Sequence, residues 1–293
     1  MNDKILHIRA AAVAFPYPQP VNTILSPSPS QAFVQIDNVD FSYGKRVILQ
    51  GISLNVPKGK VVAIMGGSGC GKSTFLRHLI GLHQPTSGDI YFEGKNIAKM
   101  NRLDMDEVRR SFGMMFQGSA LFNSMTVAEN VAVPLREHTP LPMETISIIV
   151  KIKLELVGLT GFENFYPHQI SGGMKKRVAL ARAIALDPKI VFYDEPGAGL
   201  DPITGSMIDQ LILDLSRKLN MTSVVVTHEM KSAFRIADQV IMLHKGRVLQ
   251  VGTAEEIQNS SDAYVRQFIE GEPEGVIPFK QTSEAYLNGL LDS

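Results

Sequence analysis

Alternating and continuous apolar runs punctuate this chain. Phe33 to Ile36 alternates apolar and polar side chains, and Val47 to Val56 and Ile90 to Phe92 resemble it between Gly- and Lys-containing turns. Such alternation predicts strands with one buried face. We therefore expect these three segments to pair as an antiparallel sheet.

Three other apolar runs are continuous: Lys60 to Met65, Ile190 to Tyr193 and Ser223 to Val226. Continuous runs of this length suit strands that are buried on both faces. Helical patterns lie between them, from about Lys72 to Leu82 and across residues 125 to 180. Because strands alternate with helices, we predict a mainly parallel α/β sheet.

The carboxyl-terminal part predicts a hairpin followed by helices. Ile241 to Leu243 and Val248 to Val251 flank a Lys-Gly turn, and Ala254 to Gln258 and Ala263 to Ile269 have helical patterns. A Gly- and Pro-rich break and a short amphipathic end follow. At the other end, residues 1–32 contain five prolines with interleaved serines. That composition resists both helix and sheet, so we expect a flexible extension there.

Composition narrows the class of protein. The 293 residues are 44% hydrophobic and 20% charged, which fits one large domain with extensions and a sizeable core. Lys plus Arg and Asp plus Glu both number 29, a balance that argues against a strongly basic nucleic-acid surface. The single Cys70 excludes a disulfide within one chain. No apolar run approaches the ~18 residues of a membrane span.

A phosphate-binding loop is predicted between the first buried strand and its helix. Residues 66–73 read Gly-Gly-Ser-Gly-Cys-Gly-Lys-Ser and fit the pattern G-x-x-x-x-G-K-S/T. Glycines let backbone N–H groups curl around phosphate oxygens, and the helix amino terminus adds its positive dipole end. The predicted nucleotide-binding residues here are Gly66, Gly67, Ser68, Gly69, Cys70, Gly71, Lys72, Ser73 and Thr74.

Three side chains of this loop have expected roles. Lys72 would reach the β- and γ-phosphates of ATP, Ser73 would bind Mg²⁺, and Thr74 would donate to the α-phosphate. Cys70 is interpreted as a small spacer and not as a nucleophile, because no base lies beside it in the sequence.

Polar residues also follow the other predicted buried strands. Asp194 and Glu195 end one strand, His228 follows another, and Gln117 follows the run Met114 to Phe116. Ligands gather at the carboxyl ends of strands in α/β sheets, so we expect these side chains near the phosphate loop. Asp194 would bind Mg²⁺ and Glu195 would act as general base for the attacking water.

His228 and Gln117 also have expected roles. His228 would contact the γ-phosphate or the attacking water, although a lone histidine after a strand is usually structural. Gln117 would orient water and touch Mg²⁺ without adding charge, but on its own it would be taken for a loop residue.

A second Ser-Gly-Gly loop precedes a helix at Ser171, Gly172 and Gly173. It would form another anion site at a helix amino terminus. One ATP cannot use two such sites in one subunit, so this loop is expected to contact ATP that a second copy of the chain holds. The alternative is that Ser171 simply caps the helix.

In order and spacing these motifs resemble those of ABC ATPases over about residues 33–253. The resemblance implies a P-loop NTPase fold with a RecA-like core, an antiparallel β subdomain and a helical subdomain at about residues 120–180. It also implies that Tyr43 stacks on adenine and that Asp201 lies in a loop facing the second copy. ATP hydrolysis with Mg²⁺ would be the activity.

Three segments are similar to the ATPase subunits of Mla/MCE-type lipid transporters: residues 117–131, 171–178 and 194–202. This resemblance implies phospholipid movement between the inner and outer membranes of a Gram-negative bacterium, which maintains outer-membrane lipid asymmetry. The subunit would lie on the cytoplasmic face of the inner membrane. Its partners would be a second copy in a head-to-tail dimer, a membrane permease, a STAS-domain protein and an MCE-domain lipid-binding protein. Residues 254–293 would make assembly contacts, and residues 120–129 would receive the permease.

Two alternatives remain open. One keeps the ATPase but changes the cargo to an amino acid or an ion. The other is a soluble ABC protein acting on nucleic acid. Such proteins usually carry tandem ATPase units, coiled-coil inserts or basic arms, and this chain has none of these patterns. No nucleic-acid partner is therefore expected.

Overall fold

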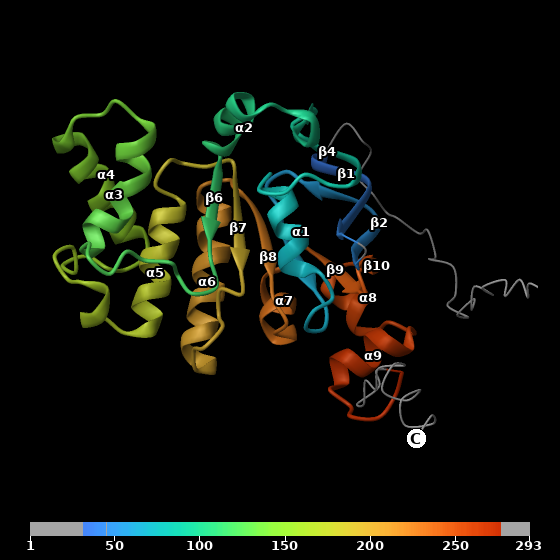
Figure 1. Ribbon diagram of the computed structural model, residues 1–293. Coiled ribbons are helices and arrows are strands. Elements are labelled where there is room, and N and C mark those ends of the chain that lie inside the picture. The colour runs from blue at the N-terminus through green and yellow to red at the C-terminus, as the bar shows by residue number, and fades with distance from the viewer. Residues whose placement is uncertain (1–31, 45, 277–293) are drawn as a thin grey trace, which may run out of the picture.

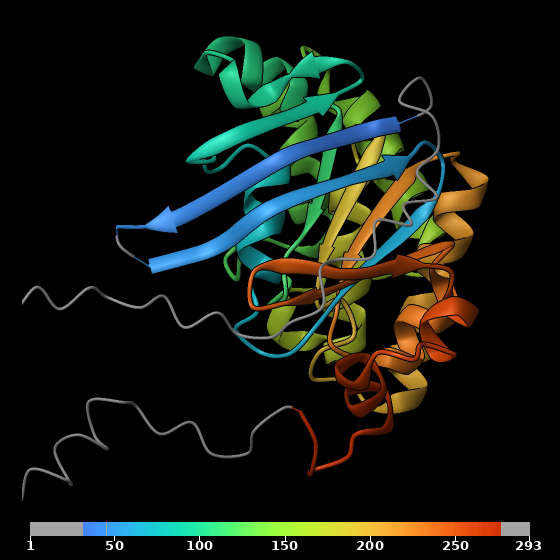
Figure 2. The ribbon, with the colours of Figure 1, turned by 90° about the vertical axis from the view of Figure 1, so that its right-hand side faces the viewer.

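The computed structural model describes residues 32–44 and 46–276, which form two sheets surrounded by helices (Figure 1). The smaller sheet is antiparallel, as predicted, and its strands run in the order β2-β1-β4-β5. Its elements are β1 (Ala32–Tyr43), β2 (Arg46–Pro57), β4 (Ser87–Phe92) and β5 (Lys95–Asn96). Figure 2 shows β1 and β2 lying across the strands of the larger sheet.

The larger sheet has the order β10-β9-β3-β8-β7-β6. Its strands are β3 (Val61–Met65), β6 (Phe112–Met115), β7 (Ile190–Asp194), β8 (Thr222–Val226), β9 (Gln239–His244) and β10 (Arg247–Gly252). All pairs are parallel except β9 with β10. The parallel α/β sheet and the closing hairpin are thus confirmed, and the carboxyl ends of β3, β8, β7 and β6 lie along one edge.

Successive side chains of β7 enter different cores. Ile190 and Phe192 pack with residues of α1 (Lys72–Leu79) and of the antiparallel sheet. Val191 and Tyr193 pack with residues of α6 (Pro202–Lys218). Because both faces are covered, the strand is apolar without alternation, which is the pattern seen in its sequence.

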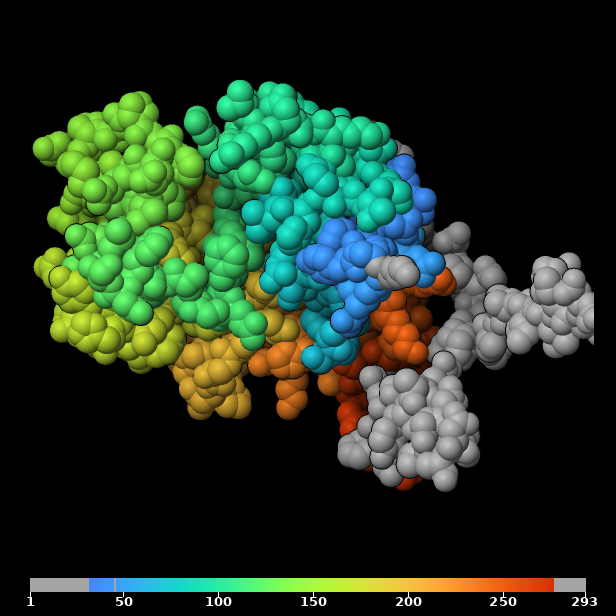
Figure 3. Space-filling model, viewed as in Figure 1, coloured from blue at the N-terminus to red at the C-terminus, as the bar shows by residue number. Residues whose placement is uncertain are grey.

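The remaining helices are α2 (Arg102–Arg109), α3 (Val127–His138), α4 (Met143–Leu156), α5 (Gly172–Ala183), α7 (Met230–Ile236), α8 (Ala254–Gln258) and α9 (Ala263–Glu270), with short 3₁₀ turns at Ile97–Lys99 and Pro167–Gln169. Helices α3, α4 and α5 form a lobe on one side of the molecule (Figure 1). An indentation separates this lobe from α2 (Figure 3). A cavity of about 210 Å³ lies there between β6 and the lobe, lined in part by Arg109, Pro134 and Arg182.

One predicted helix is shorter in the structure, and three helices occur that the sequence analysis did not predict. Helix α1 ends at Leu79 and not at Leu82, because Gly81 adopts φ 67° and its N–H donates to the His78 carbonyl. Helices α2, α6 and α7 were not predicted. The start of α6 does have a sequence signal, since Asp201 caps it and Pro202 occupies its first turn.

The predicted flexible extension, apart from Ala32, and the amphipathic end fall at residues 1–31 and 277–293, outside the described residues. Helices α8 and α9 confirm the two helices predicted after the hairpin. In the part of the chain that the structure describes, no helix is long and apolar enough to cross a membrane.

Candidate nucleotide-binding site

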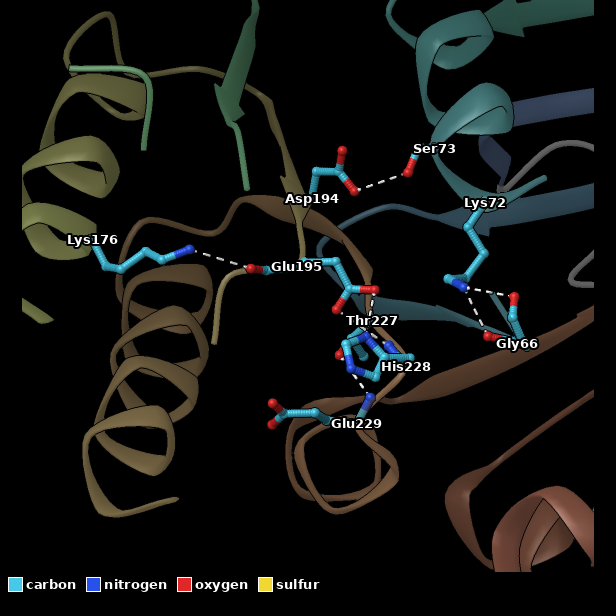
Figure 4. Close-up of polar contacts among 10 residues, drawn as sticks. Gly66, Lys72, Ser73, Lys176, Asp194, Glu195, Thr227, His228 and Glu229 are labelled. Carbon is cyan, nitrogen blue, oxygen red and sulfur yellow. Dashed lines mark hydrogen bonds and ion pairs between the residues drawn. The ribbon is translucent and has the colours of Figure 1, made fainter. Parts of the chain in front are cut away.

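The phosphate loop runs from the end of β3 into α1, as its motif predicts. Gly66 adopts φ 150°, and a Cβ there would lie 2.2 Å from the Leu243 carbonyl oxygen, so only glycine fits. Lys72 is buried, and its Nζ donates to the carbonyl oxygens of Gly66 at 2.7 Å and Gly67 at 3.1 Å. The ammonium group therefore lies inside the curl of the loop (Figure 4).

The other loop residues divide by exposure. Ser68 and Gly69 are exposed, whereas Gly71 is buried and adopts φ 108°. Cys70 is also buried, and burial raises the pKa of its thiol. A raised pKa disfavours the reactive thiolate, which favours the interpretation of Cys70 as a spacer. Thr74 is half-buried, and its carbonyl oxygen lies 2.7 Å from Nδ1 of His78.

Ser73 and Asp194 lie next to each other although they are far apart in the sequence. Ser73 Oγ donates to Asp194 Oδ1 at 3.3 Å. Burial raises the pKa of the Asp194 carboxyl group, while the Ser73 hydroxyl opposes this shift. Mg²⁺ prefers oxygen ligands and commonly shares them with substrate phosphates. This oxygen pair beside the phosphate loop fits an Mg²⁺ ion that arrives with a nucleotide.

Glu195 and His228 lie in contact just beyond the ends of β7 and β8. His228 Nδ1 lies 2.8 Å from Glu195 Oε1, and the His228 backbone N–H donates to Oε2 at 3.3 Å. Glu195 is only 8% exposed and adopts φ 50°, a left-handed conformation that is unusual outside glycine. Its own N–H donates to the Val226 carbonyl oxygen at 2.8 Å. Backbone strain of this kind occurs where surrounding contacts fix a functional side chain.

Lys176 is a site residue that the sequence analysis missed. From the first turns of α5 its Nζ donates to the Gln117 carbonyl oxygen at 2.5 Å. It also donates to the Glu195 carbonyl oxygen at 3.4 Å (Figure 4). Burial lowers the pKa of Lys176, although Glu195 and Asp194 oppose the shift. Its spacing from Leu180 and Ala183 places it on the buried face of the helix, and that spacing was the available signal.

Gln117 lies two residues beyond β6, at the sheet edge where it was predicted, and its side chain is exposed.

Tyr43 ends β1 and is 49% exposed. Its ring meets the Phe41 ring edge-on, with 4.7 Å between centroids. An exposed aromatic ring can stack on a nucleobase, and the stacking of Tyr43 on adenine stays a prediction.

The Ser-Gly-Gly loop and Asp201 cap neighbouring helices. Ser171 Oγ accepts from the Met174 N–H at 3.3 Å, so the capping that was weighed as an alternative is present. Asp201 Oδ1 accepts from Ile203 N–H and Thr204 N–H, both at 3.0 Å. The Thr204 side chain, together with these N–H groups, lowers the pKa of the Asp201 carboxyl group.

The two caps also pack together. A Cβ on Gly173 would lie 2.6 Å from Thr204 Cγ2, so the glycine allows the start of α5 to approach α6 closely. Ser171, Gly172 and Asp201 are exposed. Among the described residues, no hydrogen bond or ion pair joins this surface to residues 66–74.

Known proteins are similar to this chain in sequence. The profile of the ABC transporter family matches residues 49–198. The intermembrane phospholipid transport system ATP-binding protein MlaF of Haemophilus influenzae is 43% identical over 263 residues, covering 90% of this chain and 100% of the relative. MlaF of Escherichia coli is 44% identical over 258 residues, covering 88% and 96%. A Mycobacterium tuberculosis protein named probable ribonucleotide transport ATP-binding protein mkl is 39% identical over 269 residues, covering 90% and 75%.

Solved structures give the same likeness. The ATP-binding cassette MJ0796, in a dimeric post-hydrolysis state bound to ADP and phosphate, matches with TM-score 0.69 and 34% identity over 75% of this chain and 98% of that one. The protein cbiO1 of Clostridium perfringens, part of the ABC transporter complex cbiONQ, matches with TM-score 0.74 and 28% identity over 90% and 100%.

Proposed function

The chain belongs to the ABC transporter family of ATPases, and we propose that it drives the movement of phospholipids between the inner and outer membranes. The observation that carries the catalytic part is the Glu195–His228 pair, which lies at the same sheet edge as Lys72, Ser73 and Asp194. The names of the relatives from Haemophilus influenzae and Escherichia coli support phospholipid as the cargo.

Hydrolysis follows from these contacts. Lys72 would leave the carbonyl oxygens of the loop and bind the β- and γ-phosphates of ATP instead. Glu195, held by His228, would accept a proton from the attacking water as general base, while His228 contacts the γ-phosphate. Ser73, Asp194 and Gln117 would hold Mg²⁺, which neutralises charge on the phosphates when bound.

A head-to-tail dimer would complete each site. Ser171, Gly172 and Asp201 form an exposed surface at two helix amino termini, with the buried Gly173 beside it. Among the described residues, the Ser171 and Asp201 side chains make hydrogen bonds only within their own caps. Helix amino termini attract anions. The dimeric state of MJ0796 supports the proposal that this surface binds ATP held by a second copy.

The permease would dock beside residues 120–129. Asn130 is fully buried and its side chain bonds to backbone groups of Phe122, Met125 and Thr126, which fixes this segment. Arg182 Nη1 donates to the Ala120 carbonyl oxygen at 2.8 Å. Phe122 nevertheless remains 49% exposed. A rigid segment with an exposed aromatic ring suits contact with a membrane partner.

The full assembly would add a STAS-domain protein bound to this chain and an MCE-domain lipid-binding protein facing the periplasm. The chain itself would lie on the cytoplasmic face of a Gram-negative inner membrane. The relative from Mycobacterium tuberculosis favours ribonucleotides as a second candidate cargo, because it is named a probable ribonucleotide transport ATP-binding protein. Amino acids and ions remain the other cargo alternatives.

Copurification tests the cargo. The chain would be purified from its native membranes together with its partners, and its bound small molecules would be identified by mass spectrometry. We expect phospholipid and an MCE-domain partner to accompany it, and phospholipid to stimulate ATP hydrolysis. Copurified nucleotide derivatives without lipid, or stimulation by a soluble solute alone, would exclude the phospholipid proposal.

A further inference from the structure

Tyr264 of α9 reaches the phosphate loop from the carboxyl-terminal part of the chain. A Cβ on Gly67, the second residue of the loop, would lie 3.3 Å from the Tyr264 hydroxyl oxygen. Burial raises the pKa of Tyr264, and the backbone of Gly67 opposes that shift, as expected when a backbone N–H faces the phenol oxygen. No motif in the sequence marks this contact.

The backbone that carries Tyr264 is held in place. Asp262 caps α9, and its Oδ1 accepts from the Tyr264 N–H at 2.9 Å and the Val265 N–H at 3.0 Å. Ser260 Oγ accepts from the Asp262 N–H at 3.2 Å and donates to Gln250 of β10 at 2.6 Å. The first turn of α9 is therefore tied to the larger sheet.

The ring of Tyr264 is oriented by packing. Val265 beside it is fully buried in the core cluster that includes Met65, the residue just before the loop. The His244 and Tyr264 ring centroids lie 3.8 Å apart, and Phe268 stacks on Tyr264 at 6.4 Å. Because these two rings pack against that of Tyr264, a rotamer change would be needed to move its hydroxyl group away from the loop.

The same glycine is held by Lys72. The Gly67 carbonyl oxygen accepts from Lys72 Nζ at 3.1 Å, so Gly67 contacts the catalytic lysine as well as Tyr264. The loop also meets the β9–β10 hairpin, where the Gly246 N–H donates to the Cys70 carbonyl oxygen at 3.0 Å. Both the hairpin and Tyr264 therefore contact the loop.

We propose that Tyr264 is a positioning residue for ATP binding, and that its hydroxyl group holds Gly67 so that α9 keeps the phosphate loop in its nucleotide-binding shape. The inference rests on the proposed role of residues 66–74 in binding ATP. Tyr264 touches the loop and not the reacting atoms. A preorganised loop has less conformational entropy to lose on binding, so ATP affinity depends on Tyr264 while the chemical step does not.

Tyr264→Phe removes the hydroxyl group and keeps the ring with its contacts to His244 and Phe268. We expect ATP affinity, measured by titration with a fluorescent ATP analogue, to fall about 2- to 10-fold, the range of one hydrogen bond. KM for ATP should rise by the same factor with kcat unchanged. Tyr91→Phe is the matched control, since it removes a hydroxyl group from β4 of the other sheet.

Gly67→Ala gives a second readout that a general loss of stability would not produce. The added methyl group would press against the Tyr264 hydroxyl oxygen, and Gly67 does not need a left-handed conformation. We expect Gly67→Ala to weaken ATP binding in the wild-type chain and to weaken it less in the Tyr264→Phe background. Additive effects of the two substitutions would contradict direct contact.

The Lys72→Ala variant distinguishes a failure of the Tyr264 inference from a failure of the proposed ATP-binding site. If Lys72→Ala loses ATP binding while Tyr264→Phe binds ATP like the wild type, the positioning role is wrong and the phosphate loop stands. If Lys72→Ala binds ATP normally, the phosphate-loop proposal fails first. A fall in kcat at unchanged KM in Tyr264→Phe would also overturn the inference, because it would place Tyr264 in the chemical step.

Discussion

His228 Nδ1 lies 2.8 Å from Oε1 of Glu195, and this pair joins the carboxyl ends of two neighbouring parallel strands. The contact directs the buried carboxylate of Glu195 toward the sheet edge where the phosphate loop begins. The Glu195 backbone there adopts a left-handed φ of 50°. Glu195→Gln keeps the shape of the side chain but removes the base. We expect the ATP hydrolysis rate to fall about 10²- to 10⁴-fold with ATP binding retained.

The same variant should accumulate as a dimer in the presence of ATP, because the closed state forms without turning over. Size-exclusion chromatography with and without ATP measures this. Hydrolysis near the wild-type rate would remove Glu195 from the role of general base. A strictly monomeric chain that hydrolyses ATP at full rate would exclude the shared site.

Lys72→Ala should abolish ATP binding, since the loop loses the one cation buried within its curl. Nucleotide titration at fixed Mg²⁺ concentration measures the affinity. Lys189→Ala is the matched control, because Lys189 pairs with Glu93 at 2.6 Å on the surface. Equal affinities in the two variants would contradict the role of Lys72.

Lys176→Met should lower kcat for ATP about 10-fold or more while leaving ATP affinity close to that of the wild type. The substitution keeps the side-chain length and removes the donor that holds the carbonyl oxygens of Gln117 and Glu195, so the general base loses its orientation. Steady-state kinetics separate kcat from KM. Lys175→Met, one residue earlier on α5, serves as control, and an equal loss there would refute the positioning role.

Arg235→Met should lower the free energy of unfolding by about 1–2 kcal/mol. Arg235 Nη1 donates to Asp209 Oδ2 at 2.8 Å. Asp209 is buried, and within residues 32–44 and 46–276 its other side-chain partner is Ser232. The loss is smaller than for a fully buried pair because the Arg235 side chain is 40% exposed. Chemical denaturation measures it, and the double variant Asp209→Leu with Arg235→Met should recover part of the loss.

His78 should make stability depend on pH. It is buried against Phe41 and near His83, and burial lowers its pKa from the ordinary value of 6.5. The unfolded chain therefore binds this proton at a higher pH than the folded one. The stabilisation is complete above about pH 6.5 and is lost as the pH falls through the folded pKa.

Unfolding free energies at pH 7.5 and 5.5 measure that dependence. We expect the wild type to lose more stability between these values than His78→Gln does, whatever their absolute stabilities. His244, whose pKa burial also lowers, contributes a similar slope that both proteins share. Identical slopes in the two proteins would show that His78 does not titrate as inferred.

The sequence by itself indicated which residues would meet at the candidate site. The loop at residues 66–73, Asp194, Glu195 and His228 could be found because each follows a buried strand, and parallel strands place their carboxyl ends along one edge. The two sheets, the hairpin and the helices α8 and α9 were also predictable, since hydrophobic periodicity is a local property of the chain.

Only the tertiary structure decided which distant residues meet. The position of β8 between β3 and β7, the two carbonyl oxygens under Lys176, and the contact of Tyr264 with Gly67 join segments that are far apart in the sequence. No local pattern encodes such contacts, because they depend on how helices pack on the sheet and not on the periodicity of any one segment. The positions of Lys176 and Tyr264 beside the candidate site were therefore recognised only from the fold.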